Sequence, residues 1–255
     1  MEASGQGDKA LDLLRDYMGR RGAKPEEMLM VVSSLGRQKR FSEALDLCDK
    51  DKIWEKCPPQ VAGGICMGLL HGLTNADGNR NRVEGWLKAA IEKNPKLVVL
   101  KMQLADLYDL SGDYVDAQKK YREVLDAEPG NVVALNNLAW LLSDKTGQGR
   151  EALKYAEAAV NGMGRRADLL DTRGLVQLNL GNNEAALADF TEASTDSPTA
   201  TRLFHLARAQ YKARDRDAAM RTLRKARSDF GLEPAGLHPT EQEVCQTLMN
   251  ELKVR

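Results

Sequence analysis

The three histidines are the residues of this sequence whose side chains are best suited to acid–base or nucleophilic catalysis near neutral pH. They stand at His71, His205 and His238, far apart in the sequence, and none belongs to a nucleophile, metalloprotease or acid–base signature. His205 follows Phe204 in an amphipathic segment, where a role in packing or at the surface is expected. The sequence therefore predicts that the chain is not an enzyme.

The four cysteines are the other residues that could carry chemistry, as zinc ligands or as nucleophiles. Cys48, Cys57 and Cys66 are nine residues apart, and Cys245 is remote from them. The sequence has no Cys-x-x-Cys pair, whereas tetrahedral zinc sites usually show closely spaced ligand pairs. Because Cys48 and Cys66 stand among apolar residues, we expect reduced, buried thiols and no bound metal.

Two glycine-rich segments match the loose dinucleotide-binding pattern G-x-G-x-x-A, GQGREA from Gly147 and GMGRRA from Gly162. A phosphate-binding loop of this type needs a preceding β-strand that delivers it to the start of a helix. The neighbouring segments LNNLAWLLSDK and ALKYAEAAVN have a helical pattern instead. We therefore expect turns at both places and no cofactor.

The charges balance over the whole chain but not locally. The 37 basic and 37 acidic residues exclude the strong overall field of a dedicated nucleic-acid or membrane-surface protein. Residues 168–196 hold six acidic residues and one arginine, whereas residues 202–227 hold nine basic residues and two aspartates. One interpretation is a solvated pair of helices, and the other is recognition of an acidic partner segment, or of nucleic acid, at this end.

The sequence shows no membrane-directing segment. It has no run of about 18 apolar residues, and MEASGQGDKALDLL lacks the basic start and apolar middle of a signal peptide. We expect a soluble chain without membrane insertion, cytoplasmic or periplasmic if the protein is bacterial.

Small residues recur with a period close to 34 residues, in apolar surroundings of helical spacing such as MQLADLY and NNLAWLL. The first series is Ala105, Ala139, Gly174 and Ala207, and a second series, after a turn, is Ala117, Ala152, Ala186 and Ala219. A glycine inside a helix costs roughly 1 kcal/mol relative to alanine. Gly174 therefore indicates two closely approaching helices, and we expect it to face Ala186.

Each repeat unit reads as two helices joined by a short turn. The turns SGD, TGQG and LGNN supply glycine and short polar residues suited to helix ends, and ARDRD occupies the same place without glycine. Pro95, Pro129 and Pro198 follow second helices, which a proline cannot continue.

This pattern resembles the tetratricopeptide repeat, a helix-turn-helix unit of about 34 residues, over residues 98–231. The signature positions are filled in one copy by Leu104, Ala105, Tyr108, Gly112, Tyr114, Ala117, Tyr121 and Pro129, and in another by Gly174, Gly181, Ala186, Phe190, Ala193 and Pro198. Arg173 departs from the pattern in place of a large apolar residue, Ala156 in place of an aromatic one, and TGQG by one extra residue.

The resemblance implies an all-α fold, a right-handed superhelical solenoid of antiparallel helix pairs with a C-terminal capping helix. We expect divergent repeats over residues 1–97, well-matched repeats over residues 98–234 and the capping helix over residues 235–255. The capping helix should begin with Thr240 and Glu243 as a capping box.

The divergent part should contain two complete helix pairs. PEEMLMVVSSLGRQKRFSEALDLCDK is one pair, and VAGGICMGLLHGL with RVEGWLKAAIEKNP is the other, joined by TNADGNRN. A further helix over residues 9–21, with Ala10, Leu14 and Tyr17 on one face, resembles the second helix of a repeat.

In this family the first helices line a concave groove, so the resemblance implies that this groove binds a peptide or protein segment. The candidate partner-binding residues are Met102, Asp106, Asp109, Asn136, Asn137, Trp140, Asp171, Phe204, Arg208 and Tyr211. Trp140 and Tyr211 are expected as anchors, and Asn136 can bond a peptide backbone in both directions. The alternative for Trp140 is packing between adjacent repeats.

The sequence therefore predicts a non-catalytic protein–protein interaction scaffold, and the alternative is a regulatory or targeting module of a larger protein or enzyme. The segments NNLAWLL, EALKYAEAAV and LDTRGLVQLNLG are similar to bacterial proteins of the family, including ones associated with polysaccharide export and cell-envelope assembly. Asn137 also matches an asparagine of domains that hold the carboxylate tail of a chaperone. Asp106 and Asp168 would repel that carboxylate, so we do not expect this function.

Overall fold

The structure is a computed structural model, and every regular element that it describes is a helix. The described residues are 25–50, 58–70, 78–145 and 147–254, together with Asp8, Lys9, Asp12, Leu13 and Asp16. The apolar face expected for the helix over residues 9–21 lies outside the described residues, as do Cys57 and His71. Over the described part of the chain, the all-helical prediction is confirmed.

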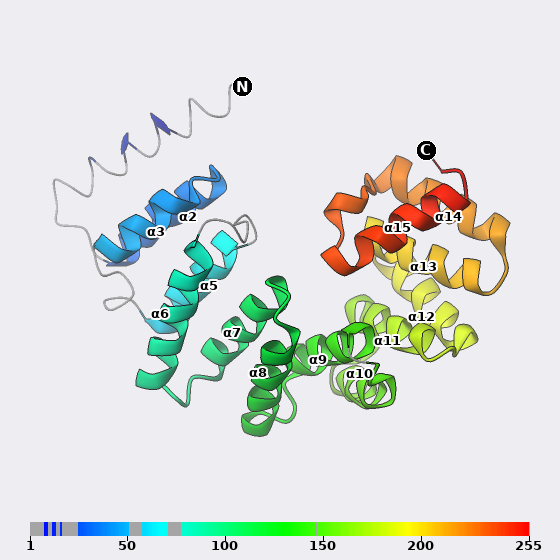
Figure 1. Cartoon of the computed structure of the whole chain (residues 1–255), viewed down its shortest axis with the longest axis horizontal. Helices are drawn as coiled ribbons and strands as arrows, with labels where there is room; N and C mark the ends of the chain where they lie inside the picture. The colour runs from blue at the N-terminus through cyan, green and yellow to red at the C-terminus, as the bar shows by residue number, and fades with distance from the viewer. Residues whose placement is uncertain are drawn as a thin grey trace. The chain divides into compact units, whose positions relative to one another are not determined.

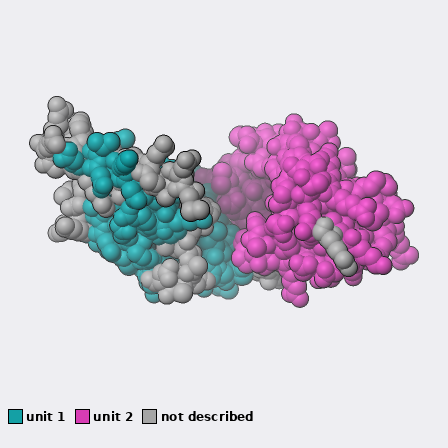
Figure 2. Space-filling model, turned by 90° about the horizontal axis from the view of Figure 1, so that it is seen from above, with its two compact units in different colours: residues 1–128 teal, residues 129–255 magenta. Residues whose placement is uncertain are grey.

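The chain divides into two compact units, residues 1–128 and 129–255, which Figure 2 colours separately. Unit 1 consists of helix pairs, in which α2 packs on α3, α5 on α6 and α7 on α8 (Figure 1). Its helices are α2 (Pro25–Arg37), α3 (Phe41–Lys50), α5 (Pro59–Leu70), α6 (Asn79–Lys93), α7 (Val98–Leu110) and α8 (Tyr114–Ala127). The pairs stack through contacts of α2 with α5 and of α7 with both α5 and α6.

Unit 2 consists of three further helix pairs and a terminal helix. The first helices of neighbouring pairs also contact one another, α11 with α9 and α11 with α13. Its elements are α9 (Val132–Lys145), α10 (Gly149–Met163), α11 (Ala167–Asn179), α12 (Asn183–Asp196), α13 (Ala200–Lys212), α14 (Arg216–Phe230), the 3₁₀ turn η1 (Pro234–Gly236) and α15 (Pro239–Glu251). Stacked helix pairs and a C-terminal helix agree with the fold that the sequence predicts.

The start of α6 differs from the sequence prediction. The segment TNADGNRN was expected to be a turn up to Asn81, but α6 already begins at Asn79. The Asn79 side chain is buried, and its Nδ2 donates a hydrogen bond to Oγ of Ser42 in α3 at 3.1 Å. Arg82 forms an ion pair with Asp49, also in α3. These contacts with α3 hold the polar start of α6 in a helix, although the sequence pattern alone assigns it to a turn.

The recurring small residues lie where the helices approach one another, and all eight are buried. A Cβ atom placed on Gly174 in α11 would lie 2.7 Å from Cε1 and 2.9 Å from Cδ1 of Phe190 in α12. Such distances are too short for carbon atoms in contact. The close approach expected at Gly174 is confirmed, and the nearest atoms belong to Phe190, one turn beyond Ala186.

The turns between paired helices share a left-handed backbone position. Gly112, Gly147 and Gly181 occupy it with φ values of 82°, 66° and 82°, and Arg214 occupies it in the last pair with φ of 67°. Gly147 thus lies in a turn as predicted, but Gly162 lies inside α10, which ends at Met163 and is followed by Gly164 at its C-cap. The helices α9 and α10, and not strands, precede the two glycine-rich segments.

The terminal helix α15 covers the apolar end of the last helix pair. Its residues Cys245, Leu248 and Met249, with Leu252 just after the helix, pack in one cluster with buried residues of α13 and α14. His238 precedes the first turn, and its Nδ1 accepts a hydrogen bond from the backbone N–H of Thr240. The predicted capping box is therefore wrong, because His238 is the N-cap residue.

None of the described helices has the length and apolar character needed to cross a membrane.

Candidate functional site

Three of the predicted partner-binding residues, Met102, Asp106 and Asp109, lie on α7 of unit 1 and are half-buried. Tyr121 of α8 donates its hydroxyl to Oδ1 of Asp106 at 2.7 Å. Asp106 therefore has a structural partner within its own helix pair, which limits what it can offer to a ligand.

The other predicted residues lie in unit 2, where Asn136, Asn137 and Trp140 of α9 are half-buried. The Trp140 ring packs against the apolar cluster around Leu175 and Phe190. It also meets the ring of His238 edge to face, with 4.5 Å between ring centroids and an interplanar angle of 74°. Trp140 thus contributes to packing between helix pairs and also contacts the residue that begins α15.

A buried polar cluster joins α11, α13 and α15. Nδ1 of His205 lies 2.9 Å from Oδ1 of Asp171, and its Nε2 lies 2.8 Å from Oε1 of Glu241. The side chains of His205 and Glu241 are only 3% and 7% exposed. Arg208, one turn after His205, has its Nη1 3.7 Å from the same Glu241 oxygen. Two carboxylates therefore face two cationic groups in a site with little water.

This arrangement keeps His205 charged at neutral pH. Burial by itself would lower the pKa of His205, but the charge of Asp171 and hydrogen bonds to Asp171 and Glu241 outweigh burial and raise the pKa to about 9. Burial would also raise the pKa of Glu241, yet the hydrogen bond and charge of His205 lower it. A protonated ring held on both sides by carboxylates is suited to fastening helices together and not to accepting a proton.

The nearest thiol is also unsuited to nucleophilic chemistry. Cys245 lies four residues after Glu241 and is fully buried. Burial, with a smaller effect from the charge of Glu241, raises its pKa to about 11, so little thiolate exists near neutral pH. Cys48 is fully buried as well, and the prediction of buried thiols is confirmed for these two residues. The side chain of Cys66 lies outside the described residues.

Phe204 is a correction to the predicted binding surface. Its side chain is fully buried in the cluster that α13, α14 and α15 share. The guanidinium carbon of Arg208 lies 5.7 Å from the centroid of its ring. Phe204 therefore belongs to the core of the last helix pair, whereas Arg208 and Tyr211 of the same helix are half-buried.

A pocket of about 300 Å³ opens between α13 and α15, beside the polar cluster. Its lining residues are Arg208, Tyr211 and Lys212 of α13 and Glu243, Val244, Thr247, Leu248 and Glu251 of α15. A hydrogen bond to Glu251 raises the pKa of Tyr211, which keeps the phenol protonated. Val244 and Leu248 give the pocket apolar walls, while the charged residues stand around them. Such a pocket can hold an apolar side chain that carries polar groups beside it.

The repeat period, the buried small residues and the paired helices agree with what comparisons with known proteins find. A family model of the tetratricopeptide repeat matches residues 203–231, which lie in α13 and α14 and end just after them. The chain has the fold of tetratricopeptide repeat proteins, and one part of it, residues 203–231, matches the family's model. A comparison with curated protein sequences gives no match.

Solved tetratricopeptide repeat structures are similar to this chain over most of its length. One, from Parabacteroides merdae, has a TM-score of 0.70 at 19% identity, over 98% of this chain and 94% of that one. A thermophilic protein of the family from Thermus thermophilus has a TM-score of 0.59 at 17% identity, over 77% and 100% of the two chains. PilW, a type IV pilus biogenesis factor, has a TM-score of 0.59 at 17% identity, over 75% and 90%. At these identities the likeness shows the fold alone.

Sequence reasoning missed the buried polar cluster of His205, Asp171 and Glu241, although one signal for it exists. Asp171 and His205 are 34 residues apart, the repeat period itself, so neighbouring first helices bring them together. Glu241 belongs to the terminal helix, outside the repeat pattern, and no spacing rule relates it to His205.

Proposed function

We propose that this tetratricopeptide repeat protein is a non-catalytic interaction module that binds a peptide or protein segment on the face of unit 2 formed by α9, α11, α13 and α15. Tetratricopeptide repeats bind protein partners, and the described face carries aromatic, amide and charged groups suited to that task. The charged His205 and the protonated Cys245 do not suit catalysis.

The pocket between α13 and α15 is the observation that carries the proposal. Two residues predicted from the sequence as partner-binding, Arg208 and Tyr211, line it together with Val244 and Leu248. Its volume of about 300 Å³ is at the lower end of the range of ligand pockets, about 300–1,000 Å³. It therefore fits one or two side chains of a partner, and the neighbouring face holds the rest of the segment.

Asn136 and Trp140 supply a second contact region on α9. Oδ1 of Asn136 is buried and has no hydrogen-bond partner among the described residues, and an unsatisfied acceptor of this kind is a place where a ligand donor is expected. The part of Trp140 that packing leaves exposed lies one turn away. An extended segment that donates a backbone N–H to Asn136 can place a side chain against Trp140.

The test is capture of partners from native lysate by the full chain, with mass spectrometry, one pocket-directed variant and one control variant. Val244→Asp introduces a charge into the pocket, and Val115→Asp on α8, at an 81% exposed position, is the matched control. Partners that bind through the pocket are lost with Val244→Asp and kept with Val115→Asp. An identical set of partners with both variants contradicts the pocket as the binding site.

The double variant Trp140→Ala, Asn136→Ala tests the α9 region with the partner so identified. Loss of a binding hot spot should weaken binding by at least about 2 kcal/mol, roughly thirtyfold, while circular dichroism shows that the helical content is kept. Unchanged affinity together with a lower melting temperature would assign Trp140 to packing alone.

A further inference from the structure

The helix α14 carries an exposed basic surface that the proposed binding face does not include. Their spacing of three and four residues places Arg221, Arg224 and Lys225 on one side of the helix, together with Ser228. All four side chains are exposed, and Arg227 stands beside them.

Most of this positive charge has no acidic counterpart among the residues that the structure describes. The residues that the structure describes form no ion pair with Arg221, Arg224 or Lys225. Arg227 has Glu233 at 3.8 Å, which is a long and exposed contact. Since exposed pairs at such distances contribute little, the guanidinium group of Arg227 also stays available to a ligand.

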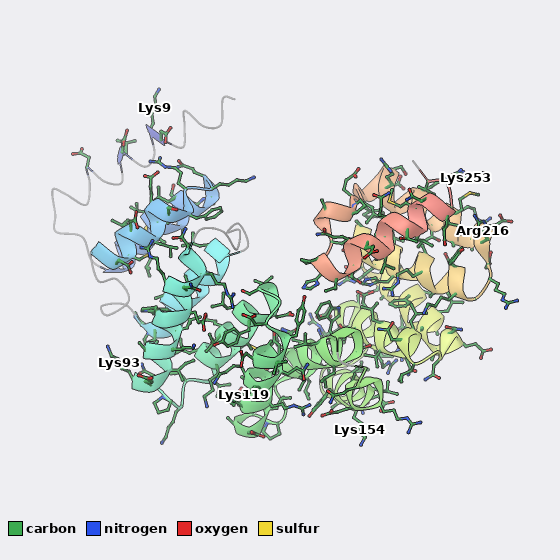
Figure 3. All side chains as sticks on the ribbon, in the orientation of Figure 1. Lys9, Lys93, Lys119, Lys154, Arg216 and Lys253 are labelled. Carbon is green, nitrogen blue, oxygen red and sulfur yellow. The ribbon has the colours of Figure 1, made fainter. Side chains whose placement is uncertain are left out.

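Two acidic residues near the ends of α14 form hydrogen bonds with groups of that helix. Asp215 accepts a hydrogen bond from the backbone N–H of Ala218 and caps the helix. Asp229 accepts one from the hydroxyl of Ser228. Arg216 turns away to the backbone carbonyl of Glu251, on the side where Figure 3 also labels Lys253.

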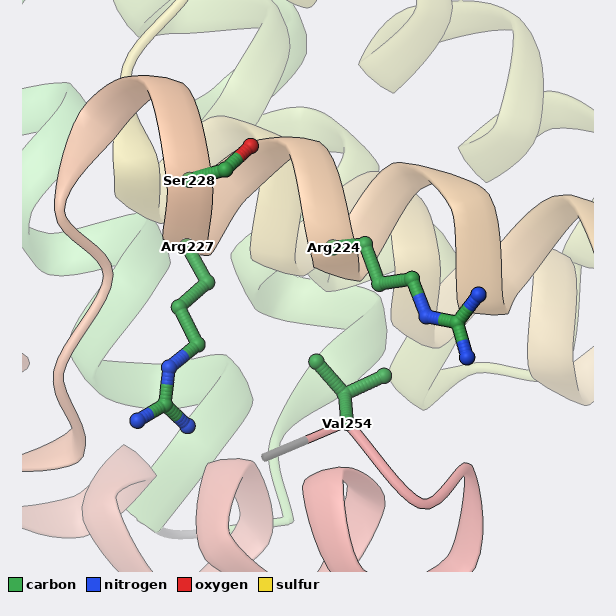
Figure 4. Close-up of a pocket in the computed structure, with 4 residues that line it drawn as sticks. All are labelled: Arg224, Arg227, Ser228 and Val254. Carbon is green, nitrogen blue, oxygen red and sulfur yellow. The ribbon is translucent and has the colours of Figure 1, made fainter.

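A pocket of about 490 Å³ lies on this basic surface. Arg224, Arg227 and Ser228 of α14 line it together with Val254, which follows α15. Figure 4 shows the guanidinium groups of Arg224 and Arg227 on opposite sides of Val254. The pocket thus has an apolar residue between two groups that bind carboxylates with paired hydrogen bonds.

We propose that this pocket binds an acidic protein segment, whose carboxylates pair with Arg224 and Arg227 while an apolar side chain lies against Val254. A protein segment fits better than a nucleic acid, because the chain as a whole has no net charge and lacks the broad positive field on which phosphate-backbone binding relies. The apolar centre of the pocket is also a contact that a phosphate backbone does not use.

This site is independent of the proposed binding face. The residues that line it differ from all of those that line the pocket between α13 and α15. A variant at Val244 therefore tests one surface and leaves the other in place.

Fluorescence anisotropy with the full chain tests the proposal directly. The probe is a labelled peptide of alternating glutamate and leucine, compared with the same peptide carrying glutamine for glutamate and with a thymidine oligonucleotide. The acidic peptide should bind, and the glutamine peptide should bind at least about tenfold more weakly, because it cannot form the charged hydrogen bonds; a factor of ten corresponds to about 1.4 kcal/mol.

Two charge-reversal variants with the same net charge locate the site. Arg224→Glu, Arg227→Glu should weaken binding at least about tenfold, whereas Lys119→Glu, Lys154→Glu, at exposed positions labelled in Figure 3, should leave it within about twofold. Arg224→Gln, Arg227→Gln replaces the first variant if circular dichroism shows that it does not fold. Val244→Asp should bind the peptide as the wild type does.

Three results would overturn the proposal. The first is that the acidic peptide does not bind the wild type, and the second is that the two charge-reversal variants lose equal affinity for it. The third is that the oligonucleotide binds more tightly than the acidic peptide and that Arg224→Glu, Arg227→Glu abolishes this binding. The last result would assign the surface to nucleic acid instead.

Discussion

Nε2 of His205 lies 2.8 Å from Oε1 of Glu241, and this contact fastens the terminal helix α15 to the first helix of the last repeat. On its other side the same ring contacts Asp171, so a single charged side chain links three helices. Loss of the histidine would remove the cationic group that Asp171 contacts, and it would leave Glu241 facing Arg208 at 3.7 Å.

The first prediction concerns the pH dependence that follows from this cluster. The pKa of His205 is about 9 in the folded chain and about 6.5 in an unfolded one. The pKa of His205 is higher in the folded chain than in the unfolded one. The stabilisation that protonated His205 gives is therefore fully present below a pH of about 6.5 and is lost as the pH rises through about 9. At pH 6 the free energy of unfolding of His205→Gln should be about 3–5 kcal/mol lower than that of the wild type. This difference should shrink towards pH 10.

Urea unfolding at several pH values measures this difference. Glu241→Gln keeps the shape of the side chain but removes one negative charge, which lowers the pKa of His205. In this variant the stabilisation by His205 should therefore be lost at a lower pH than in the wild type. A difference between the wild type and His205→Gln that stays constant from pH 6 to pH 10 would show that His205 acts only through packing.

A second prediction follows from the contact between Gly174 and Phe190. Gly174→Ala should destabilise the chain by about 1–3 kcal/mol through overpacking, although alanine is the better helix former. Gly85→Ala in α6 is the matched control, because a Cβ there meets nothing within 4 Å; it should stabilise the chain by about 0.5–1 kcal/mol. Thermal unfolding of both variants measures these changes. Stabilisation of the chain by Gly174→Ala would contradict the close approach of Gly174 to Phe190.

A third prediction uses the left-handed turn position of Arg214. A side chain with φ of 67° is strained there, and the equivalent turns hold glycine. Arg214→Gly should therefore stabilise the chain, by about 1 kcal/mol. Gly181→Ala makes the opposite change at the equivalent position and should destabilise the chain by a similar amount. Melting temperatures that move in the same direction for both variants would speak against this account.

A fourth prediction concerns Arg173, which replaces an apolar residue of the repeat pattern. Its Nε and Nη2 each donate to Asp189 of α12 at 2.7 Å, and the Asp189 side chain is only 5% exposed. Asp189→Leu alone should cost about 3–5 kcal/mol, because it leaves a half-buried guanidinium unpaired. The double variant Arg173→Leu, Asp189→Leu should recover most of this loss. A double variant less stable than Asp189→Leu would show that the ion pair does not explain the departure from the pattern.

The sequence by itself determined the helix pairs of this protein and the residues at their contacts. The reason is that the repeat period and the helical spacing are short-range patterns, so Ala105, Ala139 and Gly174 mark the same place in successive units. The turn ARDRD was recognised in the same way, because Arg214 stands one repeat after Gly181.

Only the tertiary structure decided which side chains of a first helix face a partner and which face the core. Neighbouring residues on a helix point about 100° apart, so the spacing that groups Phe204 with Arg208 and Tyr211 does not say how far α15 covers that side. The packing of α15 buries Phe204 and places Glu241 on His205, 36 residues away. The contacts of α15 depend on how this non-repeating helix packs on the last helix pair, and no periodic pattern in the sequence encodes that packing.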